Sequence, residues 1–432
     1  MAPVFGSAPA HPSTLLLRRL GERVQRLRGS AGPDPGPRAG WLQQPLDPFN
    51  SSDDRTFLQR YWVNDRHWAG GDAPVFLHLG GEGSLGPGSV MTGHPEALAP
   101  ALGALVISLE HRFYGLSVPA GGLGLAQLRY LSSRHAGGAR WGGAETGTGR
   151  GLATWRRGHV GGAGDSTVQA GRGERGGCRA AVSSAFAQVE WRLRMGGAAR
   201  STLRTELGAC GSLSRAEDRA ELLEALQALV GGAVQYDGQT GAPLSVRQLC
   251  GLLLEGARNG SHPEAYFGLR LAVQIVLHSL GQRCLSASRA QTVAQLKDTE
   301  PQASGLGDRQ WLYQTCTEFG FYVTCENAEC PFPQFPALPS HLELCEQVFG
   351  LSASSVARAV TQTNSYYGGQ APGATRVLFV NGDIDPWHML SVTQASGGSK
   401  AALLIPGASH CADMAPERPS DPTSLRSGRK AS

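Results

Sequence analysis

Two loops near the end of the chain carry residues suited to acid–base chemistry. Asp383 and Asp385 follow an apolar run that ends at Val380, and His410 follows a second run that ends at Ile405. A carboxylate can fix the tautomer of an imidazole and stabilise its charged form, so that the imidazole can take a proton from a nucleophile. An acid and then a histidine, each after a late strand, is also the chain order of one type of hydrolase triad. The spacing predicts an acid–base pair, with ordinary turn formation as the alternative for either loop alone.

A group of soft metal ligands offers a second chemistry. Four residues in one short stretch could hold zinc: Cys325, Cys330, His341 and Cys345. The four residues between Cys325 and Cys330 make this spacing wider than the two-residue spacing of many structural zinc sites, and the four prolines in this stretch favour a loop. We expect disulfides in this stretch, and a zinc-dependent hydrolase is the weaker alternative.

The cysteines also indicate a compartment. All nine lie at or after Cys178, and glycosylation sequons begin at Asn50 and Asn259. These features favour an oxidising environment, endosomal, lysosomal or secreted, with up to four disulfides and one remaining thiol. The apolar run at 15–17 is too short for a signal peptide, so the N-terminus is atypical for such a protein.

Short apolar runs outline the elements that must position these loops. Runs at 74–79, 104–109, 375–380 and 401–405 predict parallel strands buried on both faces, with a short helix at 95–99 between the first two. From 178 to about 296 apolar residues recur at three and four positions, which predicts an all-helical insertion. Ser352 is placed to cap a further helix.

Composition excludes several classes of protein. The chain has 432 residues, 41% of them hydrophobic, and a net charge of +4. The apolar fraction excludes disorder throughout, and no apolar run of 18 residues predicts a membrane span. No dense basic stripe interleaved with aromatic residues suggests a nucleic-acid surface.

Four segments together resemble the prolyl-carboxypeptidase and dipeptidyl-peptidase II family of serine peptidases. They are LHLGGEGS at 77–84, LEHRFYG at 109–115, NGDIDPW at 381–387 and GASH at 407–410. The resemblance implies an α/β-hydrolase fold with an inserted helical cap, peptide substrates cleaved near a chain end, no cofactor and no metal, and a possible homodimer. It implies that Asp385 is the triad acid and His410 the base, and that residues 80–83 form an oxyanion-hole loop. We assign Glu110, His111 and Arg112 first to structure, since buried clusters of this kind tie down neighbouring loops.

The chain departs from the family where the nucleophile belongs. No serine lies in a G-x-S-x-G elbow, and residues 136–177 contain 15 glycines among 42 residues. A helix, a central strand, the elbow and the elements after it need about 50 residues. Ser166 is the one serine of this segment and has no strand pattern before it. We therefore predict a chain without its nucleophile and with an incomplete central sheet.

The predicted organisation has six parts. They are a disordered or atypical arm (1–50), the first part of the hydrolase domain (51–135), the aberrant Gly/Arg-rich segment (136–177), the helical cap (178–345), the second part of the hydrolase domain (346–418) and a disordered tail (419–432). The predicted function is that of a serine-type peptidase that is inactive in this chain. The alternatives are a non-catalytic protein that binds peptides or a partner, or the product of a defective transcript or gene model.

Overall fold

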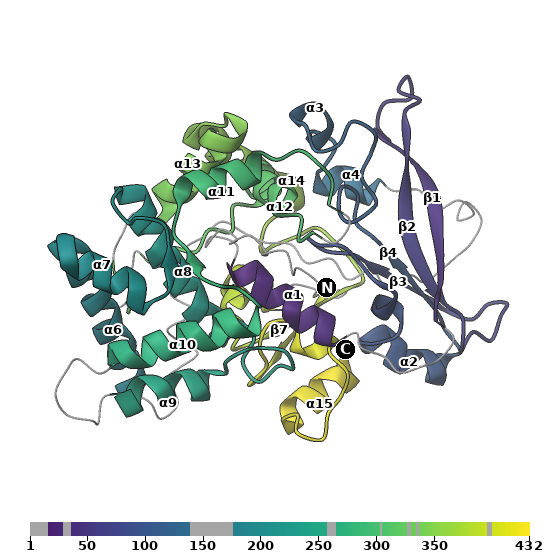
Figure 1. Cartoon of the computed structure of the whole chain (residues 1–432). Helices are drawn as coiled ribbons and strands as arrows, with labels where there is room; N and C mark the ends of the chain where they lie inside the picture. The colour runs from purple at the N-terminus through teal and green to yellow at the C-terminus, as the bar shows by residue number, and fades with distance from the viewer. Residues whose placement is uncertain are drawn as a thin grey trace, which may run out of the picture. The chain divides into compact units, whose positions relative to one another are not determined.

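The computed structural model describes residues 16–28, 36–138, 176–256, 265–302, 305–325, 330–333, 337–394 and 400–432. The chain divides into two compact units (Figure 1). The helical unit consists of Met1–Val24, Gly162–Gln295 and Val323–His341. The sheet unit consists of Gln25–Gly161, Leu296–Tyr322 and Leu342–Ser432.

The first half of the sheet unit is a four-stranded sheet. Its strands are β1 (Arg38–Pro45), β2 (Thr56–Asn64), β3 (Val75–Leu79) and β4 (Leu105–Leu109), in the order β1-β2-β4-β3. The pairs β1–β2 and β2–β4 are antiparallel, and β3–β4 is parallel. The helix α2 (His94–Leu102) connects β3 to β4. The two strands and the helix predicted here are confirmed, and the parallel pairing places the ends of β3 and β4 at one edge.

The second half contains the parallel pair β7 (Val377–Gly382) and β8 (Lys400–Ile405). The helix α14 (Ala353–Tyr367) precedes β7, and the Ser352 side chain accepts a hydrogen bond from the Ser355 backbone N–H at 3.3 Å. Both late strands and this cap are confirmed. Within the described ranges, β3 and β7 each pair with one neighbouring strand.

The segment predicted to replace the nucleophile region lies almost entirely outside the described residues. Positions 139–175, including Ser166, are not among them. The helix α4 (Ser133–Gly137) is the last described element before this segment, and α6 (Gly176–Met195) is the first after it. The predicted loss of a central strand therefore stays a prediction.

The tail predicted as disordered (419–432) contains a helix, which corrects that prediction, and the segment predicted as a disordered or atypical arm (1–50) contains a helix and a strand. The helix α1 (Leu16–Arg28) and strand β1 lie in the segment predicted as an arm, and α15 (Thr423–Ala431) lies in the predicted tail. In α1, three residues spaced by four are buried in the core of the helical unit: Leu16, Leu20 and Val24. This spacing forms one apolar helical face, which the arginine-rich composition obscured.

The helix α15 (yellow in Figure 1) needs little apolar surface because hydrogen bonds anchor it. Leu425 packs in a small core with Ile405 and Ala408. The buried Arg429 guanidinium donates to the backbone carbonyls of Ala412 at 2.8 Å and Asp413 at 3.2 Å. An amphipathic helix is predicted from its apolar face, and residues 419–432 offer only one leucine for such a face, so the sequence gives no sign of this helix.

The helical unit is built mainly from five helices and a shared core. They are α6, α7 (Gly197–Glu206), α8 (Ala216–Gln235), α9 (Val246–Gly256) and α10 (Ala265–Ser279). The two-residue strands β5 (Ala209–Cys210) and β6 (Leu285–Ser286) pair in parallel. Disulfides join Cys178 to Cys250 and Cys210 to Cys284. The predicted helical character of this region is confirmed.

The described residues also form several shorter helices and helical turns. They are α3 (Leu125–Leu128), α11 (Arg289–Lys297), α12 (Asp308–Gln314), α13 (Ala337–Phe349) and the turns Pro87–Val90, Thr315–Phe319, Pro386–Leu390 and Ala412–Met414. None of the helices in the described part of the chain has the length and apolar character that crossing a bilayer requires.

Candidate active site

The structure brings Asp385 and His410 together at the ends of two neighbouring strands. The loop after β7 carries Asp385, and the loop after β8 carries His410. The His410 Nδ1 atom lies 2.7 Å from the Asp385 Oδ2 atom. The Asp385 side chain is 3% exposed and the His410 side chain 23% exposed, so the carboxylate is enclosed and the imidazole reaches the surface. With Nδ1 donating to the acid, Nε2 is the ring atom through which the histidine would act on a nucleophile.

The two aspartates of the first loop have different roles. The backbone N–H of Gly407 donates to Asp383 Oδ1 at 2.6 Å, and the N–H of Ile384 donates to the Ala408 carbonyl at 3.1 Å. Asp383 therefore ties the two loops together, while Asp385 binds the histidine. The role of triad acid, which the family resemblance gives to Asp385, stays a prediction.

Close contact between the loops requires a glycine at the end of β7. A Cβ atom added to Gly382 would lie 2.1 Å from the backbone oxygen of Ala408. No side chain fits at that distance, so the loops can approach only because Gly382 has none. This approach holds the acid loop against the histidine loop.

Local hydrogen bonds fix the orientation of the Asp385 carboxylate. Asp385 caps the short helix Pro386–Leu390, and its Oδ1 atom accepts a hydrogen bond from the Trp387 backbone N–H at 3.0 Å. The Trp387 ring in turn contacts Phe321 edge to face at 5.9 Å between centroids. One carboxylate oxygen is thus held by the backbone and the other faces the imidazole.

The electrostatics of the pair favour a charged imidazole. Burial by itself would lower the pKa of His410, but the charges of Cys411 and Asp385 and their hydrogen bonds to the ring raise this pKa to about 10. At neutral pH His410 is therefore mainly protonated, as it would be after taking a proton from a nucleophile. To act as a base it must first release that proton.

The neighbour Cys411 is a contributor that the sequence analysis missed. Its backbone is in the left-handed region, with φ of 57°, and the cysteine forms none of the disulfides in the described residues. Nine cysteines predict up to four disulfides and one remaining thiol, but their count does not say which cysteine keeps the thiol. The position of Cys411 directly after His410 could have identified it, because a thiol next to a predicted catalytic histidine can change the charge state of the imidazole.

The segment after β4 is structural, as predicted. Glu110 is fully buried, and its carboxylate accepts hydrogen bonds from the Arg60 guanidinium and the Ser117 hydroxyl, both at 2.7 Å. Arg112 donates to the carbonyl of Leu46 at 2.9 Å and to that of Tyr130 at 3.1 Å. These bonds tie loops of the sheet unit to the end of β4.

The three cysteines among the four proposed zinc ligands form disulfides instead, and His341 alone cannot make the site, which overturns the zinc alternative. Cys325 pairs with Cys330, and Cys345 pairs with Cys316. A disulfide sulfur is not a thiolate and cannot serve as a zinc ligand of this kind. No group of three or more acidic, histidine or cysteine side chains in the described ranges could hold a metal ion.

The two loops place an acid–histidine pair at the ends of two parallel strands, in the chain order of one type of hydrolase triad. A family model for serine carboxypeptidase S28 matches residues 44–136 and 165–432. The chain therefore belongs to this family of serine peptidases, whose fold is of the α/β-hydrolase type.

Comparisons with individual proteins show which members of this family the chain resembles more strongly. The human thymus-specific serine protease is 63% identical over 473 positions, which cover 96% of this chain and 91% of that protein. The mouse protein of the same name is 62% identical, with 96% and 92% covered. The bovine lysosomal Pro-X carboxypeptidase is 24% identical, with 89% and 84% covered. Segments 61–65 and 311–320 already resemble the thymus-specific protein most within the family, and the comparison confirms that resemblance.

Proposed function

We propose that this chain is a peptidase of the S28 family that keeps the acid and base of the triad but has lost its nucleophile, and that it does not turn over peptides. The observation that carries the proposal is the break in the family match. The match stops at residue 136 and resumes at residue 165. This interval lies within the glycine-rich segment where the serine elbow belongs.

The length of the alignment with the human relative supports a deletion. It spans 473 positions, and the 96% of this chain that it covers amounts to about 415 residues, so about 58 positions are occupied only in the relative. This number is close to the about 50 residues that a helix, a central strand, the elbow and the elements after it need. The pairing of β3 and β7 with one described neighbour each is consistent with the loss of a strand between them.

In a chain with a complete triad, the described residues would have defined tasks. A serine would attack the peptide carbonyl, and His410 Nε2 would take the hydroxyl proton and then give it to the leaving amine. Asp385 would hold the ring through Nδ1 and stabilise its charge. Backbone N–H groups, by resemblance those of residues 80–83, would bind the oxyanion. Without the serine, the remaining groups leave only weak catalysis by positioning.

Substrate and location follow from the same proposal. We propose peptides cleaved near a chain end as the ancestral substrates, and an endosomal, lysosomal or secreted location for the protein. The four disulfides support an oxidising compartment, since such bonds persist there and are rare in the cytosol. A homodimer is part of this proposal by resemblance alone.

A fluorophosphonate probe tests the proposal directly, because it labels an activated serine. We expect no labelling of the purified chain. A chimera that carries the corresponding segment of the human relative in place of residues 137–164 should be labelled, and His410→Ala should remove that labelling. Labelling of the original chain that disappears with His410→Ala would overturn the proposal.

The same samples separate the remaining alternatives. Peptide binding without hydrolysis by a cooperatively unfolding chain would indicate a binding protein. A chain that lacks a cooperative unfolding transition, beside a chimera that has one, would indicate a defective transcript or gene model.

A further inference from the structure

The helical unit contains a buried group of polar side chains that is separate in sequence from the acid–histidine loops. Three acidic residues of α8 belong to it: Asp218, Glu221 and Glu224. Residues three positions apart on a helix are neighbours on its surface, so the three carboxylates point to one side of α8. The residues that meet them lie near the starts of α11 and α13, within the same compact unit: Arg289, Thr292, Ser340 and His341.

Arg289 binds two of these acids and the start of α13. Its backbone N–H donates to Asp218 Oδ1 at 3.0 Å, and its Nη1 atom donates to Glu221 Oε1 at 3.1 Å. The Thr292 hydroxyl donates to the other oxygen of Glu221 at 3.3 Å. The Nη2 atom of Arg289 donates to the Ser340 carbonyl at 2.6 Å. One arginine thus joins α8, α11 and α13 and compensates the charge of Glu221.

Glu224 differs from these two acids. Both of its carboxylate oxygens are buried, and neither accepts a hydrogen bond from any group in the described part of the chain. A buried carboxylate without hydrogen bonds is costly when it is charged, and its protonated form costs much less. Among the described residues, the one charge that acts on Glu224 is that of Arg289, which Glu221 already uses. We therefore expect the folded chain to keep a proton on Glu224 under conditions in which an exposed glutamate has lost its own.

The other ionisable groups around α8 do not supply the missing positive charge. Burial lowers the pKa of His341 to about 4, the charge of Arg289 lowers it as well, and the charge of Glu221 opposes this shift only in part. The imidazole is therefore neutral above about pH 4. The helix α1 meets α8 two turns further on, at Gly232. On α9 and α10 the ionisable side chains are exposed or engaged elsewhere: Arg247, Glu255 and His278 are exposed, and Arg270 and Tyr266 interact with Glu206.

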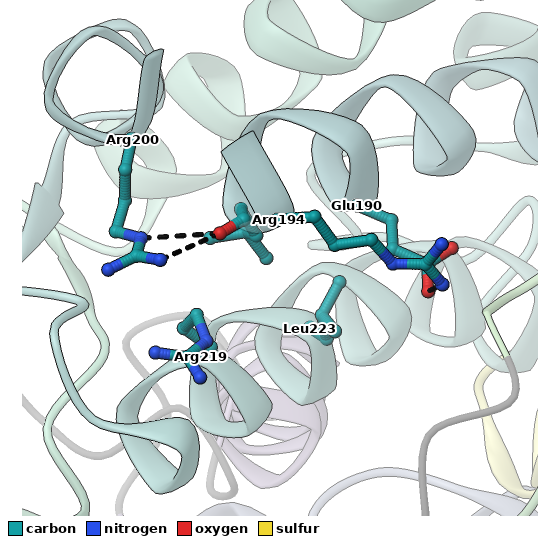
Figure 2. Close-up of a pocket in the computed structure, with 6 residues that line it drawn as sticks. Glu190, Arg194, Arg200, Arg219 and Leu223 are labelled. Atoms are coloured by element: carbon teal, nitrogen blue, oxygen red, sulfur yellow. Dashed lines mark hydrogen bonds and ion pairs between the residues drawn. The ribbon is translucent and has the colours of Figure 1, made fainter. Parts of the chain in front are cut away.

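The opposite face of α8 offers a carboxylate for comparison. There Arg219 and Leu223 line a pocket of about 260 Å³ together with residues of α6 and α7 (Figure 2). The carboxylate of this pocket, Glu190, bonds to Arg194 at 2.5 Å, and its side chain is 32% exposed. Water and an arginine both stabilise its charge, so the removal of this carboxylate is a suitable control for the removal of Glu224.

We propose that Glu224 forms a proton-dependent contact between α8 and the starts of α11 and α13, which is tight when the carboxyl group is protonated and loosens when it is charged. A charged Glu224 must recruit water or compete with Glu221 for the Arg289 guanidinium. Either event separates the helices that Arg289 joins. Because this contact lies wholly within the helical unit, it is independent of whether the chain turns over peptides.

The direction of the effect follows from where the proton binds more tightly. Burial raises the pKa of Glu224 to about 7 from its ordinary value of 4.5, and the Ser340 side chain and the charge of Arg289 oppose this shift only in part. The folded state therefore holds the proton more tightly than the unfolded state. The resulting stabilisation is complete below about pH 4.5 and is lost as the pH rises through about 7.

Glu224→Gln tests the proposal, because the amide keeps the shape of the protonated carboxyl group and cannot ionise. Chemical denaturation of the full chain at intervals between about pH 4.5 and 8 gives the unfolding equilibrium constant of each protein. We expect the constant of the original chain, divided by that of Glu224→Gln, to rise at least about tenfold over this range. Glu190→Gln is the control, and the same ratio for it should stay nearly constant. A ratio for Glu224→Gln as flat as that for Glu190→Gln would overturn the proposal.

Hydrogen exchange of the original chain is a second test that needs no variant. The amide of Arg289 donates to Asp218 on α8, and the amide of Thr292 donates to the Ser288 carbonyl in the first turn of α11. After correction for intrinsic exchange rates, both amides should lose at least about tenfold more protection than the amides of α10 as the pH rises from about 5 to 8. Equal losses in the two sets, or a helical unit without protection at acid pH, would also contradict the proposal.

Discussion

Glu110 and Asp385 are two buried carboxylates that follow strands of the same unit, and their surroundings give them different roles. Glu110 meets Arg60, the Ser117 hydroxyl and the backbone N–H groups of Leu85 and Leu116. Every one of these donors belongs to the framework of the sheet unit, so this carboxylate acts in stability. Asp385 is equally enclosed, yet it bonds a histidine that is partly exposed. A buried carboxylate can influence a reaction at the surface when the group to which it is hydrogen-bonded is itself exposed.

The largest effect that distinguishes the two sites is expected from Glu110→Ala. This change leaves Arg60 without its carboxylate and removes the acceptor of several N–H and O–H groups. Breaking a buried ion pair in this way costs about 3–5 kcal/mol of unfolding free energy. Chemical denaturation measures it, and Arg38→Gln is the control, because Arg38 pairs with Asp65 in an exposed position and should cause only a small loss. A small loss of unfolding free energy in Glu110→Ala would contradict the stabilising role given to Glu110.

Gly382→Ala should separate the loops that carry the acid and the base. The new methyl group would meet the Ala408 backbone oxygen, which cannot move away as a side chain could. We expect a loss of about 1–3 kcal/mol and a weaker signal from the hydrogen-bonded His410 Nδ1 proton in NMR spectra. Gly373→Ala is the control, since no atom lies within 4 Å of the position of its added Cβ. An unchanged proton signal in Gly382→Ala would contradict the role given to Gly382.

Asp385→Asn should change the charge state of His410 more than it changes the fold. Loss of the neighbouring negative charge is expected to lower the pKa of His410 from its value of about 10. Cys411→Ser should also lower this pKa, because the charge of Cys411 contributes to it. An NMR titration of the imidazole measures both changes. Asp383→Asn is the control, and an equal shift in that variant would show that the effect is not specific to the pair.

The same pair predicts the sign of a pH dependence of stability. The pKa of His410 is about 10 in the folded chain, whereas the ordinary pKa of a histidine in an unfolded chain is 6.5, so the proton binds more tightly to the folded state. The stabilisation is complete below about pH 6.5 and is lost as the pH rises to about 10. Unfolding free energies at intervals across this range should therefore fall more steeply in the original chain than in Asp385→Asn. Parallel curves would contradict a raised pKa.

The smallest effect is expected outside both sites. Ser352→Ala removes the side-chain cap of α14 and should cost about 1 kcal/mol. This loss of unfolding free energy is that of a single exposed hydrogen bond, and the losses caused by changes at the two carboxylates can be compared with it. Thermal unfolding measures it, and Ser352→Asp should restore most of the loss. No change in Ser352→Ala would show that α14 begins without help from its cap.

Strands and site residues could be predicted from the sequence where a short apolar run and the residues directly after it are enough to identify them. The strands at 74–79, 104–109, 375–380 and 401–405 and the pairing of Asp385 with His410 could be predicted because a buried strand and the loop at its end are local features. The role of Asp383 could not be predicted in this way. It depends on the backbone of Gly407, 24 residues later, and only the folded loops bring the two together.

Helices that are anchored mainly by polar contacts could not be predicted from the sequence. The helix α15 has a single strongly buried leucine, and its main anchor is a buried arginine. An arginine-rich stretch is usually a solvated or disordered arm. Two of the acceptors of Arg429 are backbone carbonyls, which leave no mark in a sequence, and the third is the carboxylate of Asp421, at 2.7 Å. The spacing of Leu16, Leu20 and Val24 did carry a helical signal, but the surrounding composition outweighed it.

The anchoring of α15 gives the last residues of the chain influence over the imidazole. Arg429 holds the carbonyls of Ala412 and Asp413, which lie two and three positions beyond His410. Trimming of the terminal residues by an exopeptidase, or an affinity tag fused to them, would thus disturb the histidine loop without touching either member of the pair. A preparation that has lost those residues would give altered imidazole titrations, and mass spectrometry of the intact chain should precede any such measurement.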